Sequence, residues 1–302
     1  MTMISAARRD AIREALPALR LGEVLGGGAG GWVIAAYDES DGAPVAVKVL
    51  ADERLRAPHA RERLRTEAGV LINCRHPNLI EGIAFYELDE MVLLVMERVG
   101  STTVLQRQVE VGVTVQDACG IALAAARALH CVHDFGLLHG DVKPDNVLFD
   151  PSGRHRLADF GLARRWPFSR ERHIVGTPEY LAPEGIVNGG VLVPATDVYA
   201  LGVTTYELLA GQSPYLSADG WRGVMKLHVH AAAIPLLAVA PHLPPPLASL
   251  VMAAIEREVD DRIQSAAEFA DRLAAITEPA GVLPRGDSVT GRRAGGPAGP
   301  TA

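Results

Sequence analysis

The 302-residue sequence predicts an α+β protein of two lobes, in which a strand-rich part precedes a mainly helical part. Between about residues 19 and 99, short apolar runs are separated by turn residues, as expected for strands. From residue 101 onward, the apolar residues follow helical spacing. Residues 278–302 are rich in Gly and Pro and nearly lack large apolar side chains, so we expect a disordered tail.

The first part contains five predicted strands and one predicted helix. The strands cover residues 21–25, 32–37, 45–50, 79–86 and 91–96. Asp41-Gly42 predicts the turn between the second and third strands. The helix covers residues 60–74, because several apolar side chains share one helical face: Leu64, Ala68, Leu71 and Ile72. Residues 1–18 are expected to form an extension before this part.

The second part contains four long helical patterns. They cover residues 114–133, 195–210, 248–255 and 265–276. The first is Ala-rich and nearly apolar all round, which predicts a helix buried in a core. Ser265, followed three residues later by Glu268, predicts the N-terminal cap of the last helix.

Composition and charge exclude several classes of protein. A net charge of -7 gives no electrostatic reason to expect nucleic acid or anionic membranes as partners. The three cysteines contain no C-x-x-C pair, which argues against a zinc site or a disulfide framework and suits a reducing cytosol. The N-terminus shows no signal peptide, and no apolar stretch is long and uninterrupted enough to span a bilayer. We therefore expect a cytoplasmic protein.

A glycine-rich segment is the first feature that carries chemistry. Gly26, Gly28, Gly31 and Val33 fit the pattern G-x-G-x-x-G-x-V. Glycines let backbone N–H groups approach phosphate oxygens, because no Cβ stands in the way. A simple turn is the alternative reading. A dinucleotide-binding motif is excluded, because a strand and not a helix follows.

Lys48 is the second feature, since it follows three strand-forming residues in Val45-Ala46-Val47-Lys48. A surface lysine is the alternative reading. Glu67 lies in the predicted helix of the same lobe, where it could pair with Lys48. Such a pair would hold Lys48 against the phosphates of a nucleotide.

Three short motifs form the most specific signal. They are His139-Gly140-Asp141-Val142-Lys143-Pro144-Asp145-Asn146, Asp159-Phe160-Gly161 and Ala182-Pro183-Glu184. Taken singly, they could be acidic turns, because Asp, Asn, Pro and Gly all favour turns. Their order and spacing together favour a functional reading.

These motifs resemble those of the eukaryotic-type (Hanks-type) Ser/Thr protein kinase family. The resemblance covers about residues 19–276. It implies a bilobal protein-kinase-like fold, with an N-terminal five-stranded antiparallel sheet plus one helix (residues 19–97) and a mainly helical C-terminal lobe (101–277). It also implies ATP and Mg²⁺ as cofactors and protein hydroxyls as substrates.

The resemblance implies a role for each motif residue. Asp141 would be the catalytic base, with Lys143 steadying the γ-phosphate and Thr177 hydrogen-bonded near both. Asn146 and Asp159 would hold Mg²⁺. Lys48, oriented by Glu67, would bind phosphates. The residues implied to bind ATP are Gly26, Gly28, Gly31, Val33, Ala46, Lys48, Met96, Glu97, Val99 and Leu148. For Val33, Ala46, Met96 and Leu148, core packing alone is the alternative.

Two further implied contacts concern structure. Asp197 resembles the buried acidic helix residue that, in this family, braces the catalytic loop, here residues 139–146. Arg262 resembles the ion-pair partner of Glu184, and losing one member of a buried pair would be costly.

One position departs from the family pattern, because Gly140 stands where most members have Arg. That Arg normally pairs with a phosphorylated residue of the activation loop. Ser169 remains a possible phosphosite beside a basic cluster: Arg164, Arg165, Arg170 and Arg172. Our hypothesis is that activity does not require phosphorylation of this loop.

Two other functions stay open at this point. His139-Gly140-Asp141 also resembles the loop of small-molecule phosphotransferases such as the aminoglycoside kinases. Residues 176–184 argue against this reading, because they resemble the segment that docks the substrate peptide in protein kinases, and the aminoglycoside kinases lack such a segment. A pseudokinase that acts as a scaffold is the second alternative. It is disfavoured because the residues that catalysis would need are all present: Lys48, Glu67, Asp141, Asn146 and Asp159.

Overall fold

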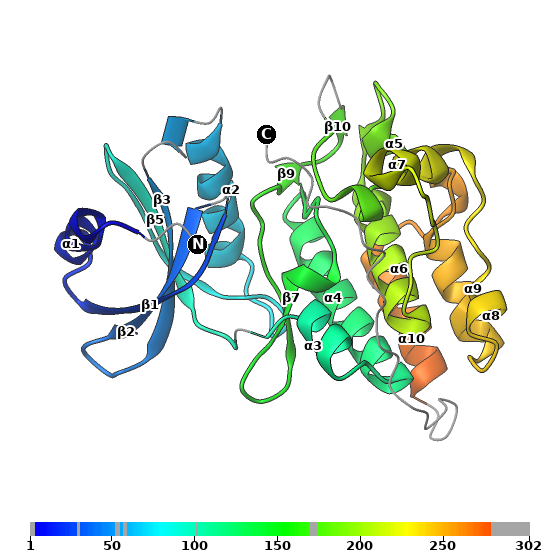
Figure 1. Ribbon diagram of the computed structural model, residues 1–302, viewed down its shortest axis with the longest axis horizontal. Coiled ribbons are helices and arrows are strands. Elements are labelled where there is room, and N and C mark those ends of the chain that lie inside the picture. Colours follow the sequence, from blue (N-terminus) through cyan, green and yellow to red (C-terminus); the bar gives the residue numbers. More distant parts are fainter. Residues whose placement is uncertain are drawn as a thin grey trace.

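The computed structural model describes residues 4–28, 31–51, 55–56, 59–100, 102–169 and 174–278. It contains a sheet-based N-terminal lobe and a mainly helical C-terminal lobe (Figure 1). The elements of the first lobe are α1 (Ala6–Ala15), β1 (Leu19–Gly28), β2 (Gly31–Asp38), β3 (Pro44–Ala51), α2 (Ala60–Asn73), β4 (Gly82–Glu87) and β5 (Met91–Glu97). The predicted α+β, bilobal fold is therefore confirmed.

The five strands form one antiparallel sheet in the order β1-β2-β3-β5-β4. Successive side chains of a strand point to opposite faces. Val47 and Val49 of β3 consequently pack on one face, whereas Leu50 packs with α2 on the other. Lys48 alternates with the two valines, so it lies on the α2 side of the sheet.

Helix α1 was not predicted from the sequence. It begins after the N-cap Ser5, whose hydroxyl accepts a hydrogen bond from the Arg8 N–H (3.2 Å). Its buried Ile12 packs with Leu16 against the apolar face that Val47 and Val49 supply. Figure 1 places α1 on the side of the sheet opposite α2. Residues 4–16 therefore belong to the packed structure of this lobe.

The strand predicted over residues 79–86 begins only at Gly82. Leu79 instead forms an isolated parallel bridge with Leu157 of the other lobe, and the Ile80 N–H donates to the Leu157 carbonyl (3.2 Å). Leu79 and Ile80 are buried in a core cluster to which both lobes contribute, although neither belongs to a strand of the sheet. Alternating hydrophobicity could not distinguish the two environments.

The C-terminal lobe is built around long helices. Its helices are α3 (Val104–Glu110), α4 (Val115–Asp134), α5 (Pro183–Ile186), α6 (Pro194–Ala210), α7 (Gly220–His230), α8 (Leu236–Val239), α9 (Pro245–Ala254) and α10 (Ala266–Thr277). Helix α4 packs against α6 and α10, and most of its apolar residues are buried, as predicted. Ser265 caps α10 by accepting from the Glu268 N–H (3.1 Å), also as predicted.

Short strands and single turns shape the loops between these helices. The strands pair as β6 (Leu137–Leu138) with β9 (Arg164–Arg165), β7 (Val147–Phe149) with β8 (His155–Leu157), and β10 (Phe168–Ser169) with β11 (Val191–Leu192). The 3₁₀ turns are η2 (Pro144–Asn146), η3 (Pro178–Tyr180) and η4 (Val259–Asp261).

No helix in the described ranges is both long enough and apolar enough to cross a bilayer. The predicted disordered tail lies outside the described residues, apart from Glu278.

Candidate active site

Asp141 lies in the loop between β6 and η2, and its carboxylate is surrounded by donors. Oδ1 accepts from the backbone N–H (3.1 Å) and the hydroxyl (2.7 Å) of Thr177. Oδ2 accepts from Lys143 Nζ (2.6 Å) and Asn146 Nδ2 (3.2 Å). Lys143 Nζ also donates to the Thr177 hydroxyl (2.6 Å). The expected contacts of Thr177 with both residues are thus present, although Thr177 is far away in sequence.

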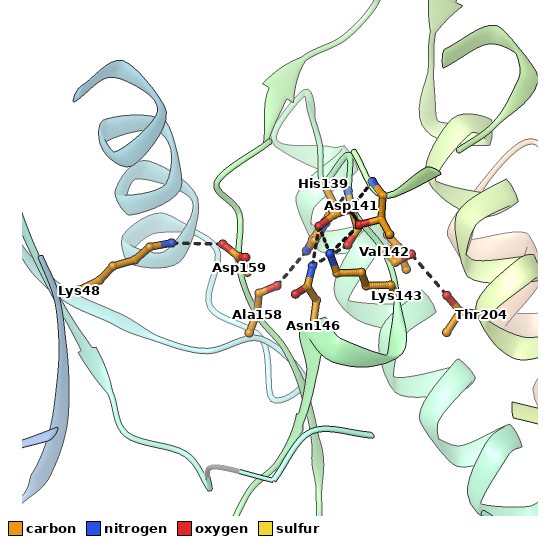
Figure 2. A network of polar contacts seen from close by, with 10 residues as sticks. Lys48, His139, Asp141, Val142, Lys143, Asn146, Ala158, Asp159 and Thr204 are labelled. Atoms are coloured by element: carbon orange, nitrogen blue, oxygen red, sulfur yellow. Dashed lines mark hydrogen bonds and ion pairs between the residues drawn. The ribbon is translucent and has the colours of Figure 1, made fainter. Parts of the chain in front are cut away.

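The loop that carries Asp141 is fixed by its own polar groups (Figure 2). Asn146 Nδ2 donates to the Asp141 carbonyl (2.7 Å). His139 Nδ1 accepts from the Asp141 N–H (3.2 Å), so Nε2 carries the proton and donates to the Ala158 carbonyl (3.0 Å). The ring of His139 thereby links the loop to the segment just before Asp159.

Lys48 joins the two lobes. Its Nζ lies 2.7 and 2.8 Å from the two Glu67 carboxylate oxygens and 3.2 Å from Asp159 Oδ1, the contact drawn in Figure 2. Burial by itself would lower the pKa of Lys48, but the charges of Glu67 and Asp159 outweigh it and raise the pKa. Lys48 therefore stays charged, and its predicted pairing with Glu67 is observed.

Asp159 presents a carboxylate beside this ammonium. Its backbone φ of 61° lies in the left-handed region, which is uncommon for residues other than Gly. The charge of Lys48 holds the pKa of Asp159 below its usual value. The side chain keeps 54% of its surface exposed, so the ionised oxygens remain accessible.

The glycine-rich segment forms the hairpin between β1 and β2, with Gly28 opposite Gly31 and Gly26 opposite Val33. Gly31 has a φ of 111°, and a Cβ there would overlap the Val49 carbonyl. A Cβ on Gly26 would meet no atom within 4 Å. Gly31 is thus required by the fold, whereas Gly26 leaves open space. The side chains of the loop tip lie outside the described residues.

The apolar residues that the resemblance implies to bind ATP come from both lobes. Ala46 is buried and lies opposite Met96 across β3 and β5, and Val33 lies opposite Lys48 across β2 and β3. Val99, in the segment between the lobes, and Leu148, in β7, pack against the core. Glu97 is held by the Glu81 N–H, which donates to its Oε1 (2.9 Å).

Asp197 braces the catalytic loop from the first turn of α6. Its carboxylate is buried and accepts from the backbone N–H groups of His139 (2.8 Å) and Gly140 (2.9 Å). It also accepts from His133 Nε2 (2.9 Å). Burial opposes ionisation of Asp197, but these hydrogen bonds lower its pKa. His133 was not among the predicted site residues. The sequence signal that could have identified it is its position, as a polar residue on the buried face of the apolar helix α4.

The predicted pair of Glu184 and Arg262 is also present. Arg262 Nη1 and Nη2 lie 2.8 and 3.1 Å from the two Glu184 carboxylate oxygens, and both residues are buried. A second contact was missed: the Tyr180 hydroxyl donates to Glu207 (2.5 Å). Together these contacts hold the segment of residues 177–184 on the helical lobe.

Gly140, the departure from the family pattern, has a φ of 79°. Nearby, Arg164 Nε donates to the Leu162 carbonyl (3.2 Å), and its guanidinium lies over the Phe168 ring. Ser169 pairs through its backbone with Val191. Of the expected basic cluster, Arg170 and Arg172 lie outside the described residues.

The structure combines a sheet lobe with a helical lobe and places four polar residues at the site: Lys48, Asp141, Asn146 and Asp159. This combination defines a protein of the kinase class. Comparison of the sequence agrees, because the protein kinase domain matches residues 19–272. The chain therefore belongs to the eukaryotic-type Ser/Thr protein kinase family.

Bacterial relatives support this assignment. The chain is 35% identical to the serine/threonine-protein kinase PknA of Mycobacterium tuberculosis (strain ATCC 25177 / H37Ra) over 269 residues, which are 85% of this chain and 61% of that protein. It is 36% identical to the serine/threonine-protein kinase pkn2 of Myxococcus xanthus over 264 residues, 83% of this chain and 31% of pkn2. The chain thus spans less than two thirds of the length of these relatives.

Proposed function

We propose that this protein transfers the γ-phosphate of Mg-ATP to serine or threonine hydroxyls of other proteins, in the cytoplasm and as a step of signalling. One observation carries the proposal. Asp141 is held by Lys143 and Thr177 and lies close to Asn146 in the sequence and in space. The ion pair between Lys48 and Asp159 faces this group (Figure 2). This set contains an acceptor for a hydroxyl proton and cations for a phosphate.

The side chains fit a bound magnesium ion. Asp159 offers an ionised, half-exposed carboxylate. The amide nitrogen of Asn146 is committed to Asp141, and its Oδ1 accepts no hydrogen bond from any described residue, so that oxygen is free to coordinate. Mg²⁺ prefers such oxygen ligands. The described chain gathers no group of three His, Cys, Asp or Glu side chains for a metal, so phosphate and water would complete the coordination. When bound, Mg²⁺ would neutralise phosphate charge.

The residues on the nucleotide side act mainly by position and charge. Glu67 keeps Lys48 ionised and binds its Nζ, which suits Lys48 to hold phosphate oxygens. The open space at Gly26 lets the backbone of β1 approach those oxygens. Phosphoryl transfer spreads negative charge over the transferred group, so cations placed in advance lower the barrier.

On the acceptor side, Asp141 would orient the substrate hydroxyl and receive its proton. Lys143 Nζ lies 2.6 Å from both Asp141 and the Thr177 hydroxyl, so its charge stands beside the reacting oxygen. An incoming hydroxyl would replace one of the donors that now occupy the Asp141 carboxylate.

Autophosphorylation with labelled Mg-ATP, followed by mass spectrometry of the modified sites, tests the proposal. The wild-type protein should label itself and casein, but neither aminoglycosides nor sugars. Asp141→Asn should abolish labelling while nucleotide affinity stays nearly unchanged, because Asp141 faces the acceptor. Nucleotide binding without any turnover in the wild type would favour the pseudokinase, and transfer to small amines only would favour the small-molecule phosphotransferase.

A further inference from the structure

A cavity of about 280 Å³ lies at the loop that joins α2 to β4, apart from the residues assigned to catalysis. Its walls come from the loop and from β8, and they include Cys74, Arg75, His76, Glu81 and Arg156. Pockets for drug-sized ligands start at roughly 300 Å³, so this cavity suits a small molecule.

The walls of this cavity are preformed. The Leu157 N–H donates to the Asn78 carbonyl (2.8 Å), and Asn78 Nδ2 donates to the His155 carbonyl (3.0 Å). Arg156 Nη1 donates to the Leu79 carbonyl (3.0 Å). The loop is therefore fixed to β8, and a ligand would not have to order it.

His76 offers a hydrogen-bond donor at the wall. The Asn78 N–H donates to His76 Nδ1 (3.1 Å), so in the neutral ring the proton is on Nε2. Among the described residues, that Nε2–H has no hydrogen-bond partner. Burial, followed by the charges of Arg127, His130 and Arg156, lowers the pKa of His76. The ring is therefore neutral near pH 7.

Arg75 offers a cation that is only weakly engaged. Its one ion pair in the described chain is with Glu81 at 3.5 Å, and the Arg75 side chain is 78% exposed. Exposed pairs of this kind contribute little, so a better acceptor can replace Glu81. The backbone N–H groups of Arg75 and His76 also donate to no described residue. The wall therefore presents several donors beside the single carboxylate of Glu81.

We propose that the cavity binds a small phosphate-bearing anion, with Arg75 and the His76 Nε2–H as its main donors. Tetrahedral phosphate oxygens accept several hydrogen bonds at once, which matches a guanidinium beside a ring N–H. The same chemistry is found in free phosphate and in a small phosphomonoester, and these two ligands are tested separately.

Isothermal titration calorimetry with inorganic phosphate and with glycerol phosphate, at constant ionic strength, tests this site. Arg75→Ala should weaken binding about tenfold or more, because one charge-assisted hydrogen bond is lost. His76→Phe should weaken it as well. Arg272→Ala removes the same charge from α10 and should leave the affinity unchanged. Lys48→Met, which removes the cation of the proposed active site, should also leave it unchanged.

The size of the two ligands gives a further outcome. Tighter binding of glycerol phosphate would identify a phosphomonoester as the preferred ligand, whereas equal affinity would identify free phosphate as sufficient. The proposal is overturned if the wild type shows no saturable heat up to about 10 mM of either probe. It is also overturned if binding survives Arg75→Ala and disappears in Lys48→Met. Because Arg75 is exposed, its replacement should not alter thermal unfolding, which is recorded for every variant.

Discussion

The buried guanidinium of Arg262 offers a direct test of how the helical lobe is held together. Its Nη1 and Nη2 bind Glu184, and the group donates further to three backbone carbonyls: Ala195 (2.8 Å), Glu256 (2.9 Å) and Arg257 (3.2 Å). The side chain is fully buried, and that of Glu184 is 8% exposed. Arg262→Met keeps most of the volume and removes every one of these donors.

The expected cost follows from what the substitution leaves behind. An unpaired buried carboxylate costs about 3–5 kcal/mol. The three carbonyls lose their charged donor as well, so we expect the free energy of unfolding to fall by at least about 4 kcal/mol. For a domain of this size, each kcal/mol corresponds to roughly 2–4 °C, so the melting temperature should fall by about 8 °C or more.

Urea and thermal unfolding followed by circular dichroism measure this loss. Arg272→Met is the matched control, because Arg272 pairs with Glu268 on the exposed face of α10 at 3.3 Å. It should cost no more than about 0.5 kcal/mol. Adding Glu184→Gln to Arg262→Met should restore part of the loss, because the unpaired charge is removed. A cost for Arg262→Met as small as that of the control would refute the reasoning.

Three further predictions follow from individual residues. Ser169→Ala should leave kcat unchanged in a peptide phosphorylation assay, because Gly140 cannot supply the usual receptor for a phosphate; a large loss of rate would contradict this. Gly31→Ala should lower stability by about 2 kcal/mol, because its φ of 111° is strained for Ala and its Cβ would overlap the Val49 carbonyl. Gly26→Ala, where a Cβ meets nothing, should unfold like the wild type in the same melting experiment. Burial opposes ionisation of Asp150, but hydrogen bonds from the turn that follows lower its pKa. Its stabilisation is therefore present above about pH 4 and is lost as the pH falls further, so Asp150→Asn should flatten the acid dependence of urea unfolding.

The first lobe shows how far the sequence could predict the fold. The strands and α2 were found because their patterns are local, with periods of two and about 3.6 residues. Helix α1 was missed, although the strands contained a signal for it. Both faces of β3 are apolar around Lys48, and α2 covers only one of them, so the sheet needed a second cover. Ile12 and Leu16 supply it.

The site shows a different limit. Asp141, Lys143 and Asn146 could be grouped from the sequence, because they lie within six residues of one another. The approach of Thr177 to Asp141 spans 36 residues, and only the family resemblance suggested it. The sequence marks His133 only as a polar residue on the buried face of an apolar helix. It could not identify the partner, because Asp197 lies on another helix, 64 residues away.

The first turn of α6 explains why these distant segments meet. Asp197, in that turn, accepts hydrogen bonds from the catalytic loop and from His133 on α4. An acidic residue is favoured there, because the N-terminus of a helix carries partial positive charge. The Ala195 carbonyl, in the same turn, accepts from Arg262, which binds Glu184 at the end of the segment of residues 177–184. One buried helix start therefore positions both the loop that carries Asp141 and the segment that carries Thr177, so the geometry of the site depends on the packing of α6 as much as on the site residues themselves.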